Sequence, residues 1–146
     1  LWEIDRLSSF MEKNANLKAV FGARVQLIGR NVKRKAYRHY IGRFFATLFS
    51  QILRFPVYDT QCGAKVFRFD DNLMESLSIP FITRWLFDVE LLSRMARQLN
   101  EHETPDLFIR EEPLLQWKHV NGSNIGLGTA LQILTETFRI WKNCRS

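Results

Sequence analysis

Short apolar segments bounded by turns alternate along this sequence with longer segments of helical periodicity, and this alternation restricts the fold more than any other feature. A brief apolar run between turn signals favours a strand, whereas apolar residues every three or four positions favour a helix. The expected strands cover residues 18–23, 64–69, 81–83, 107–110 and 113–117. The expected helices cover residues 2–13, 37–53, 71–77, 88–99 and 125 onward. We therefore expect an α/β fold, and 146 residues give room for one domain, over residues 1–146.

Composition and cysteine content indicate which broad class of protein the chain belongs to. The chain is 46% hydrophobic and 25% charged, as in a packed domain rather than a disordered one. Its most apolar stretch, residues 44–53, is about half as long as a membrane-spanning helix, and no secretory leader is visible. Cys62 and Cys144 are too few for a disulfide framework or a cysteine zinc site. We expect reduced thiols and a cytoplasmic location.

The positive charge is concentrated in one segment. The net charge is +6, and residues 24–54 hold eight Lys and Arg with no Asp or Glu, so the rest of the chain is close to neutral. Such a segment attracts anions: phosphate groups of a small ligand, nucleic acid or an anionic membrane surface. The alternative is a solvated face of a surface helix.

Two short motifs have both a binding and a structural interpretation. Gly22-Ala23-Arg24 ends the first expected strand, where open α/β sheets place ligands and a guanidinium can hold phosphate oxygens at two points. Alternatively, Arg24 closes the strand and pairs with a surface carboxylate. Residues 59–63, which include Asp59, Thr60 and Gln61, suit the wall of a polar pocket or a capped turn.

A third motif, residues 84–90, contains a candidate catalytic acid. Asp88 falls in the first turn of an expected helix, where the helix dipole favours a carboxylate, so it can be a simple cap. The flanking Trp85 and Phe87 are expected to desolvate it and raise its pKa, as in a general base. Asp88 and Glu90 are two positions apart and cannot share a helix face.

Taken in order, these motifs resemble the C-terminal half of family 2 inverting glycosyltransferases, most closely the branch of dolichyl-phosphate and polyprenyl-phosphate glucosyltransferases. The resemblance covers nearly the whole chain. It is carried by Gly22-Ala23-Arg24, the basic helix, VYDTQCGAKVFR at 57–68, RWLFDVELL at 84–92, Trp117 and Gly122-Ser123. It implies part of a GT-A (nucleotide-diphospho-sugar transferase) fold, with a mixed sheet and flanking helices. No DxD motif is present. We expect the N-terminal nucleotide-binding half to be missing, and this acceptor-side half to be inactive alone.

The resemblance also implies the site. Asp88 takes the family's acidic catalytic position. Arg24 takes the position of a phosphate-contacting residue, and one or both of Arg38 and Arg43 fall where the family has arginines for the lipid phosphate. The expected substrate-binding set consists of these arginines together with Asp59, Thr60, Gln61, Arg84 and Trp85, whereas Asp88 is the expected catalytic residue. Relatives have serine at Ala23 and lysine at Asn124, which leaves Lys118 as the possible phosphate contact there.

The implied reaction transfers a hexose, with inversion, from a nucleotide sugar to a lipid-linked polyprenyl or dolichyl phosphate or another acceptor. Mg²⁺ or Mn²⁺ is expected in the full-length enzyme, with none bound by this chain. The expected location is the cytoplasmic face of a membrane, because Phe44, Phe45, Phe49 and Phe55 beside arginines suit an interfacial helix; a core helix is the alternative. A basic nucleic-acid-binding module is the alternative function. It leaves the Asp59 and Arg84 motifs unexplained, so no nucleic-acid partner is expected.

Overall fold

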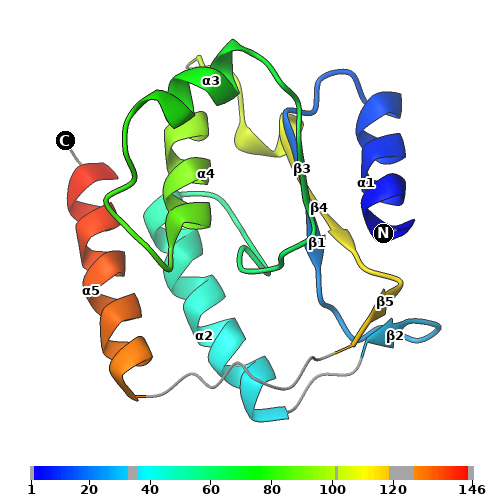
Figure 1. Cartoon of the computed structure of the whole chain (residues 1–146), viewed down its shortest axis with the longest axis horizontal. Helices are drawn as coiled ribbons and strands as arrows, with labels where there is room; N and C mark the ends of the chain where they lie inside the picture. Colours follow the sequence, from blue (N-terminus) through cyan, green and yellow to red (C-terminus); the bar gives the residue numbers. More distant parts are fainter. Residues whose placement is uncertain (1, 33–35, 101, 119–126, 145–146) are drawn as a thin grey trace.

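A computed structural model of the protein describes residues 2–32, 36–100, 102–118 and 127–144. The elements, in chain order, are α1 (Trp2–Lys13), β1 (Ala19–Ala23), β2 (Asn31–Val32), α2 (Ala36–Leu53), β3 (Lys65–Phe67), α3 (Asp71–Ser78), α4 (Phe87–Arg97), a 3-10 turn (Pro105–Leu107), β4 (Ile109–Pro113), β5 (Gln116–Trp117) and α5 (Leu127–Cys144). The expected α/β class is confirmed, with a small mixed sheet and flanking helices (Figure 1). The expected loop over residues 119–124 lies outside the described residues.

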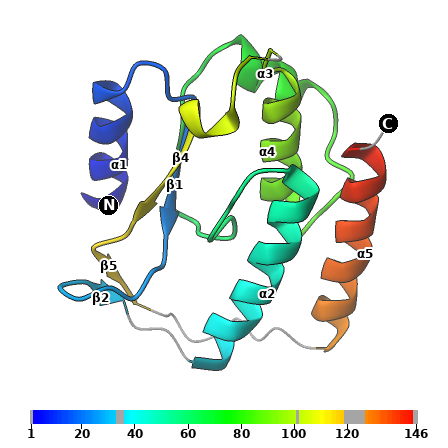
Figure 2. The same ribbon diagram turned by 180° about the vertical axis from the view of Figure 1, so that it is seen from behind.

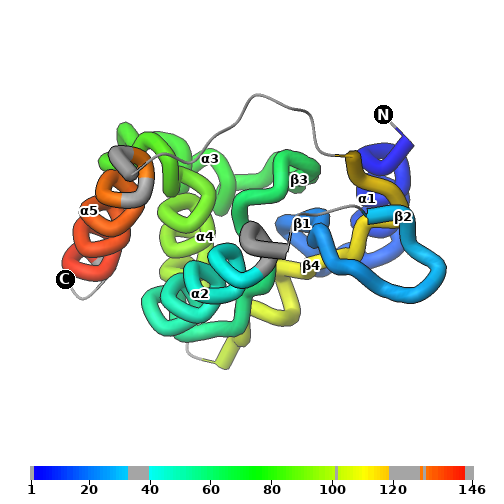
Figure 3. The backbone as a smooth tube through the Cα atoms, turned by 90° about the horizontal axis from the view of Figure 1, so that it is seen from below, coloured from blue at the N-terminus to red at the C-terminus, as the bar shows by residue number. Residues whose placement is uncertain are grey.

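The main sheet has the strand order β3-β1-β4 and separates two cores. β1 pairs antiparallel with β3 and parallel with β4. Helix α1 covers one face, where Leu7 and Met11 pack with Val20. Helices α2 and α4 cover the other face, where Phe21 lies in the larger core, and α5 forms the outermost layer (Figures 1 and 3). The short parallel pair β2-β5 lies beyond the C-terminal end of β1 (Figure 2).

Every residue of β1 is buried, because the strand is central and covered on both faces. Gly22 sits at the closest approach between β1 and its neighbours. A Cβ added there lies 2.7 Å from Leu114 Cδ2 and 3.1 Å from Ala64 Cβ, well inside van der Waals contact. Leu114 is buried and has little freedom to move away. The packing around β1 therefore requires glycine at position 22.

Replacing Gly22 with alanine is expected to lower the free energy of unfolding by about 1–3 kcal/mol, the usual cost of overpacking a core. Thermal or denaturant unfolding followed by circular dichroism measures this. Gly63→Ala is the matched control, because a Cβ there meets no atom within 4 Å. Equal stability of the two variants would show that Leu114 and Ala64 make room at no cost.

Residues 81–83 do not form the expected strand. The backbone amides of Ile82 and Thr83 donate to the carboxylate of Glu90 at 3.1 and 3.0 Å, and the Thr83 hydroxyl donates to it at 2.7 Å. A carboxylate thus takes the amide hydrogens that a neighbouring strand would otherwise bind. The segment is a loop that leads into α4.

The expected strands near residue 110 are also displaced. Residues 105–107 form the 3-10 turn, β4 then covers Ile109–Pro113 as one continuous strand, and β5 is limited to Gln116–Trp117. Parallel pairing with β1 selects this register, since Ala19 pairs with Ile109 and Ala23 with Pro113. Leu99, expected on the face of α4, follows the end of that helix.

The outer helices expose much of their apolar surface. On α5 the side containing Leu131, Leu134, Phe138 and Trp141 is the exposed one. The buried side consists of Ile133, Glu136, Thr137 and Ile140. On α2, Phe49 is buried in the core, Phe45 packs against it and Phe44 is exposed, so the helix has both a core face and an open apolar face. Within the described residues, no helix has the length and apolar character needed to cross a membrane.

Candidate functional site

The candidate site lies at the edge of the sheet where β1 and β4 end and β3 begins. Arg24 follows β1 directly, and the loop of residues 59–63 reaches the same edge because the Gly22 amide donates to the Ala64 carbonyl oxygen at 2.8 Å. Asp88 comes from the first turn of α4. The structure therefore brings together Arg24, Asp59, Gln61 and Asp88, which the sequence places in three separate motifs.

Arg24 and Asp59 form a bidentate pair. Arg24 donates from Nε to Asp59 Oδ2 and from Nη2 to Oδ1, both at 2.7 Å, and its backbone amide donates to Oδ2 at 3.0 Å. The side chains are 18% and 5% exposed. Burial alone lowers the pKa of Arg24, but the hydrogen bonds and charge of Asp59 raise it above its ordinary value. The guanidinium also lies 5.3 Å from the centre of the Trp117 ring. Arg24 is thus paired with a carboxylate, one that is buried rather than at the surface.

Glu111 of β4 holds the backbone that leads into Asp59. Its two carboxylate oxygens accept hydrogen bonds from the amides of Tyr58 and Asp59, both at 2.7 Å. Burial raises the pKa of Glu111 and the Asp59 carboxylate raises it further, although the two amides oppose this shift. Arg43 of α2 stacks over the Tyr58 ring, with 4.5 Å between the guanidinium carbon and the ring centre. The segment of residues 58 and 59 therefore connects Arg43, which lies over Tyr58, with Glu111 and with the Arg24–Asp59 pair.

Asp88 belongs to a second buried charge pair. Lys65 Nζ lies 3.0 Å from Asp88 Oδ1, and Lys65 also donates to the Cys62 carbonyl oxygen. Gln61 Nε2 lies 3.4 Å from Asp88 Oδ2. The buried Oδ1 depends on Lys65 as its partner. Glu90 belongs to a separate group with Thr83 and Arg94, so the two acids of this motif do not share a site.

The pKa of Asp88 is raised, as the sequence predicts. Burial is the main cause, and the charge of Lys65 opposes it. Trp85 and Phe87 are themselves 46% and 45% exposed, so they are not a closed apolar cover over the carboxyl. The Asp88 carboxylate is buried because the first turn of α4 places it against Lys65 and Gln61 at this end of the sheet.

Thr60 and Cys62 are both buried, whereas Gln61 between them is exposed. Thr60 lines a cavity of about 230 Å³ whose wall also includes Phe55, Leu92 and Glu111. Burial raises the pKa of the Cys62 thiol, which keeps it protonated and unreactive at neutral pH. The side chain of Cys144 lies outside the described part of the structure.

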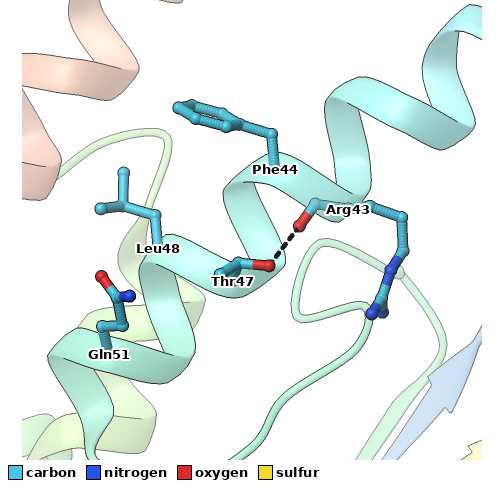
Figure 4. Close-up of a pocket in the computed structure, with 5 residues that line it drawn as sticks. All are labelled: Arg43, Phe44, Thr47, Leu48 and Gln51. Atoms are coloured by element: carbon cyan, nitrogen blue, oxygen red, sulfur yellow. Dashed lines mark hydrogen bonds between the residues drawn. The ribbon is translucent and has the colours of Figure 1, made fainter.

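The remaining predicted binding residues belong to α2 and to the segment after β5, and among their side chains that the structure describes only Arg43 has a contact with the candidate site. Arg43 extends toward the Tyr58 loop, whereas Phe44 and Leu48 project to another side of α2, along an open depression of about 350 Å³ (Figure 4). Lys118 is exposed just after β5. Arg38 lies in α2, but its side chain is outside the described structure. These assignments stay predictions.

Arg84 and Trp85 are exposed, but the backbone beneath them is fixed. Glu136 of α5 accepts hydrogen bonds from the amides of Trp85 and Leu86 at 2.8 and 3.0 Å, at the N-terminus of α4. Although burial raises the pKa of Glu136, hydrogen bonds from Gln132 and from these backbone amides lower it below its ordinary value. An ionised Glu136 therefore holds the two residues that directly precede α4, close to the positive end of the helix dipole.

The described residues include no group of three His, Cys, Asp or Glu side chains that could hold a metal ion. The acids of the site are already engaged with Arg24, Lys65 and backbone amides. These acids therefore offer no ready ligand set at this edge, and the Mg²⁺ or Mn²⁺ expected in the full-length enzyme stays a prediction.

Lys65, Glu111 and Glu136 complete the site but are absent from the expected set. Each had a signal in the sequence: a charged residue at an inward position of an apolar pattern. Glu111 is two positions after Ile109 in β4, so the two side chains share a face of the strand. Glu136 lies between the buried residues Ile133 and Ile140 at helical spacing. A buried charge needs a partner, so such positions mark long-range pairs.

Comparison of the chain with protein-family models, curated proteins and solved structures finds no match in any of the three.

Proposed function

We propose that this chain is the acceptor-side half of an inverting glycosyltransferase that transfers a hexose from a nucleotide sugar to a polyprenyl or dolichyl phosphate. The observation that carries the proposal is the edge cluster, which gathers the Arg24, Asp59 and Asp88 motifs. The order of these motifs along the chain is the one that resembles the family. The metal and nucleotide would be bound by sequence that this chain does not contain.

In this proposal the acceptor phosphate is the nucleophile. A phosphate monoester with a second pKa near about 6 is largely dianionic at pH 7, so it needs no base to remove a proton. Asp88 then orients the acceptor or the sugar, and exposed arginines such as Arg43 and Arg84 hold the anion in place. A hydroxyl acceptor would instead require Asp88 as general base.

The outer helices support a membrane surface as partner. The sequence of α2 contains no Asp or Glu, and the single acid of α5, Glu136, is buried. Their exposed groups include Phe44 on α2 and Phe138 and Arg139 on α5. An apolar and cationic surface without exposed acids suits the interface of a membrane that contains anionic lipids.

Binding to vesicles tests the proposal with this chain alone. We expect the chain to sediment with phosphatidylcholine vesicles containing a polyprenyl monophosphate at least about tenfold more tightly than with phosphatidylglycerol vesicles of equal charge. Contacts of an arginine with a phosphate dianion account for a difference of this size. Arg84→Ala should remove most of the preference, whereas Arg110→Ala, an exposed arginine on β4, should not.

Equal binding to both anionic vesicles would contradict a phosphate-specific acceptor site. Tighter binding to a single-stranded oligonucleotide than to any vesicle would favour the nucleic-acid alternative. Transfer of hexose from a nucleotide sugar by this chain alone would refute the half-enzyme assignment.

A further inference from the structure

The loop that precedes α4 is held by two carboxylates from different elements. Glu90, one turn into α4, accepts the amides of Ile82 and Thr83 and the Thr83 hydroxyl. Glu136 accepts the amides of Trp85 and Leu86 from α5. Both acids are buried, at 4% and 3% exposed. Four backbone amides within five residues are thus fixed by ionic hydrogen bonds, which are stronger than neutral ones.

Glu90 and Glu136 are each held in place by further contacts. Arg94 donates to Glu90 Oε1 at 2.5 Å, and Gln132 donates to Glu136 Oε1 at 2.9 Å. Because Glu136 occupies the N-terminus of α4, the Trp85 and Leu86 amides are not available to an anionic ligand. An anion that contacts residues 82–86 therefore meets side chains rather than these amides.

The side chains of Arg84 and Trp85 extend outward from this fixed backbone. Arg84 is exposed and Trp85 is 46% exposed, although a tryptophan of a folded domain is normally largely covered. An arginine beside a tryptophan offers a phosphate contact and an apolar surface at one place. A rigid backbone under exposed binding groups lowers the entropy lost when a ligand binds.

We propose that residues 82–86 form a pre-organised binding element in which Arg84 and Trp85 contact an apolar phosphate monoester and Glu136 is the positioning residue. The identity of the ligand rests on the proposed function. Glu136 also fixes the start of the helix that carries Asp88, two residues after Leu86. The last helix of the chain is thereby coupled to the candidate catalytic acid.

Hydrogen exchange and vesicle binding of Glu136→Gln test this role. The substitution keeps the size of the side chain but removes its charge. We expect exchange of the Trp85 and Leu86 amides to rise at least about tenfold, with β1 amides unchanged, and binding to polyprenyl monophosphate vesicles to weaken about fivefold to tenfold. Glu75→Gln, at an exposed position of α3, is the control and should change neither.

A double-variant comparison separates positioning from general destabilisation. In an Arg84→Ala, Trp85→Ala background, Glu136→Gln should weaken vesicle binding no further, because it acts only through these two side chains. Unchanged exchange at Trp85 and Leu86, or a further loss of binding in that background, would overturn the inference. If the wild-type chain shows no preference for polyprenyl phosphate, the proposed function fails, while the exchange measurement still decides the role of Glu136.

Discussion

Replacing Asp59 with alanine is expected to lower the free energy of unfolding by about 3–5 kcal/mol. The change leaves the Arg24 guanidinium, 18% exposed, without its bidentate partner, and an uncompensated buried charge costs this much. It also removes the acceptor of the Arg24 backbone amide. Urea unfolding followed by fluorescence and circular dichroism measures the loss.

Two variants make this result specific. Replacing both partners, as in Arg24→Met with Asp59→Leu, should cost much less than Asp59→Ala, because no unpaired charge remains. Asp5→Ala, at an exposed position of α1, should change stability by under about 0.5 kcal/mol. A loss below about 1 kcal/mol for Asp59→Ala would mean that solvent already screens the pair, as at the surface.

Replacing Lys65 with methionine is expected to cost up to about 4 kcal/mol at pH 7 and at most about 1.5 kcal/mol near pH 5, because each pH unit above the unfolded pKa of Asp88 adds at most about 1.4 kcal/mol. Without Lys65, the pKa of Asp88, already raised by burial, rises further. A carboxyl whose pKa is higher in the folded state than the unfolded value of about 3.9 destabilises the fold when ionised. The penalty is absent below the unfolded pKa, grows as pH rises from that value to the folded pKa, and is constant above it. Unfolding measured from pH 4.5 to 7.5 tests this slope.

Adding Asp88→Asn to Lys65→Met should remove most of the pH dependence, because the group that titrates is gone. If Lys65→Met lowers the free energy of unfolding equally at pH 5 and pH 7, the loss comes instead from packing of the lysine side chain against Phe21, whose ring centre lies 5.4 Å from Nζ.

Local sequence signals were enough to predict the elements that carry the site. The apolar run before Arg24 predicted β1, and the acid in a first helical turn predicted the place of Asp88 on α4. The two acids before the short helix α3, Asp70 and Asp71, each suit a cap by sequence, and in the structure it is Asp70 that accepts the Leu73 amide at 2.9 Å. In each case neighbouring residues determine the structure, so a pattern within a short window is sufficient.

The pairings within the site could not be predicted, because they join segments distant in sequence. Arg24 and Asp59 are 35 positions apart, and Trp85 and Glu136 are 51 apart. Which partner each charge finds depends on how the strands and helices pack. The same limit explains residues 81–83, whose apolar pattern suits a strand but whose amides meet Glu90.

The orientation of α5 shows a related limit. Its more apolar stripe, with Leu131 and Phe138, faces outward, and the mixed stripe of Ile133, Glu136 and Ile140 faces the core. Apolar content alone favours the opposite orientation. The contacts of Ile133 and Ile140 with the core, together with the bonds of Glu136 to α4, select the observed one.

The parallel pairing of β1 with β4 has a consequence for synthesis on the ribosome. Ala19 pairs with Ile109, so the central strand meets this neighbour only after about 90 further residues have been made. At roughly 5–20 residues per second, the apolar strand is without that partner for about 5–20 s. Closing so long a loop is also entropically costly, which slows folding. A nascent chain that contains β1 but not β4 is therefore expected to leave one edge of this apolar strand unpaired until β4 has been made.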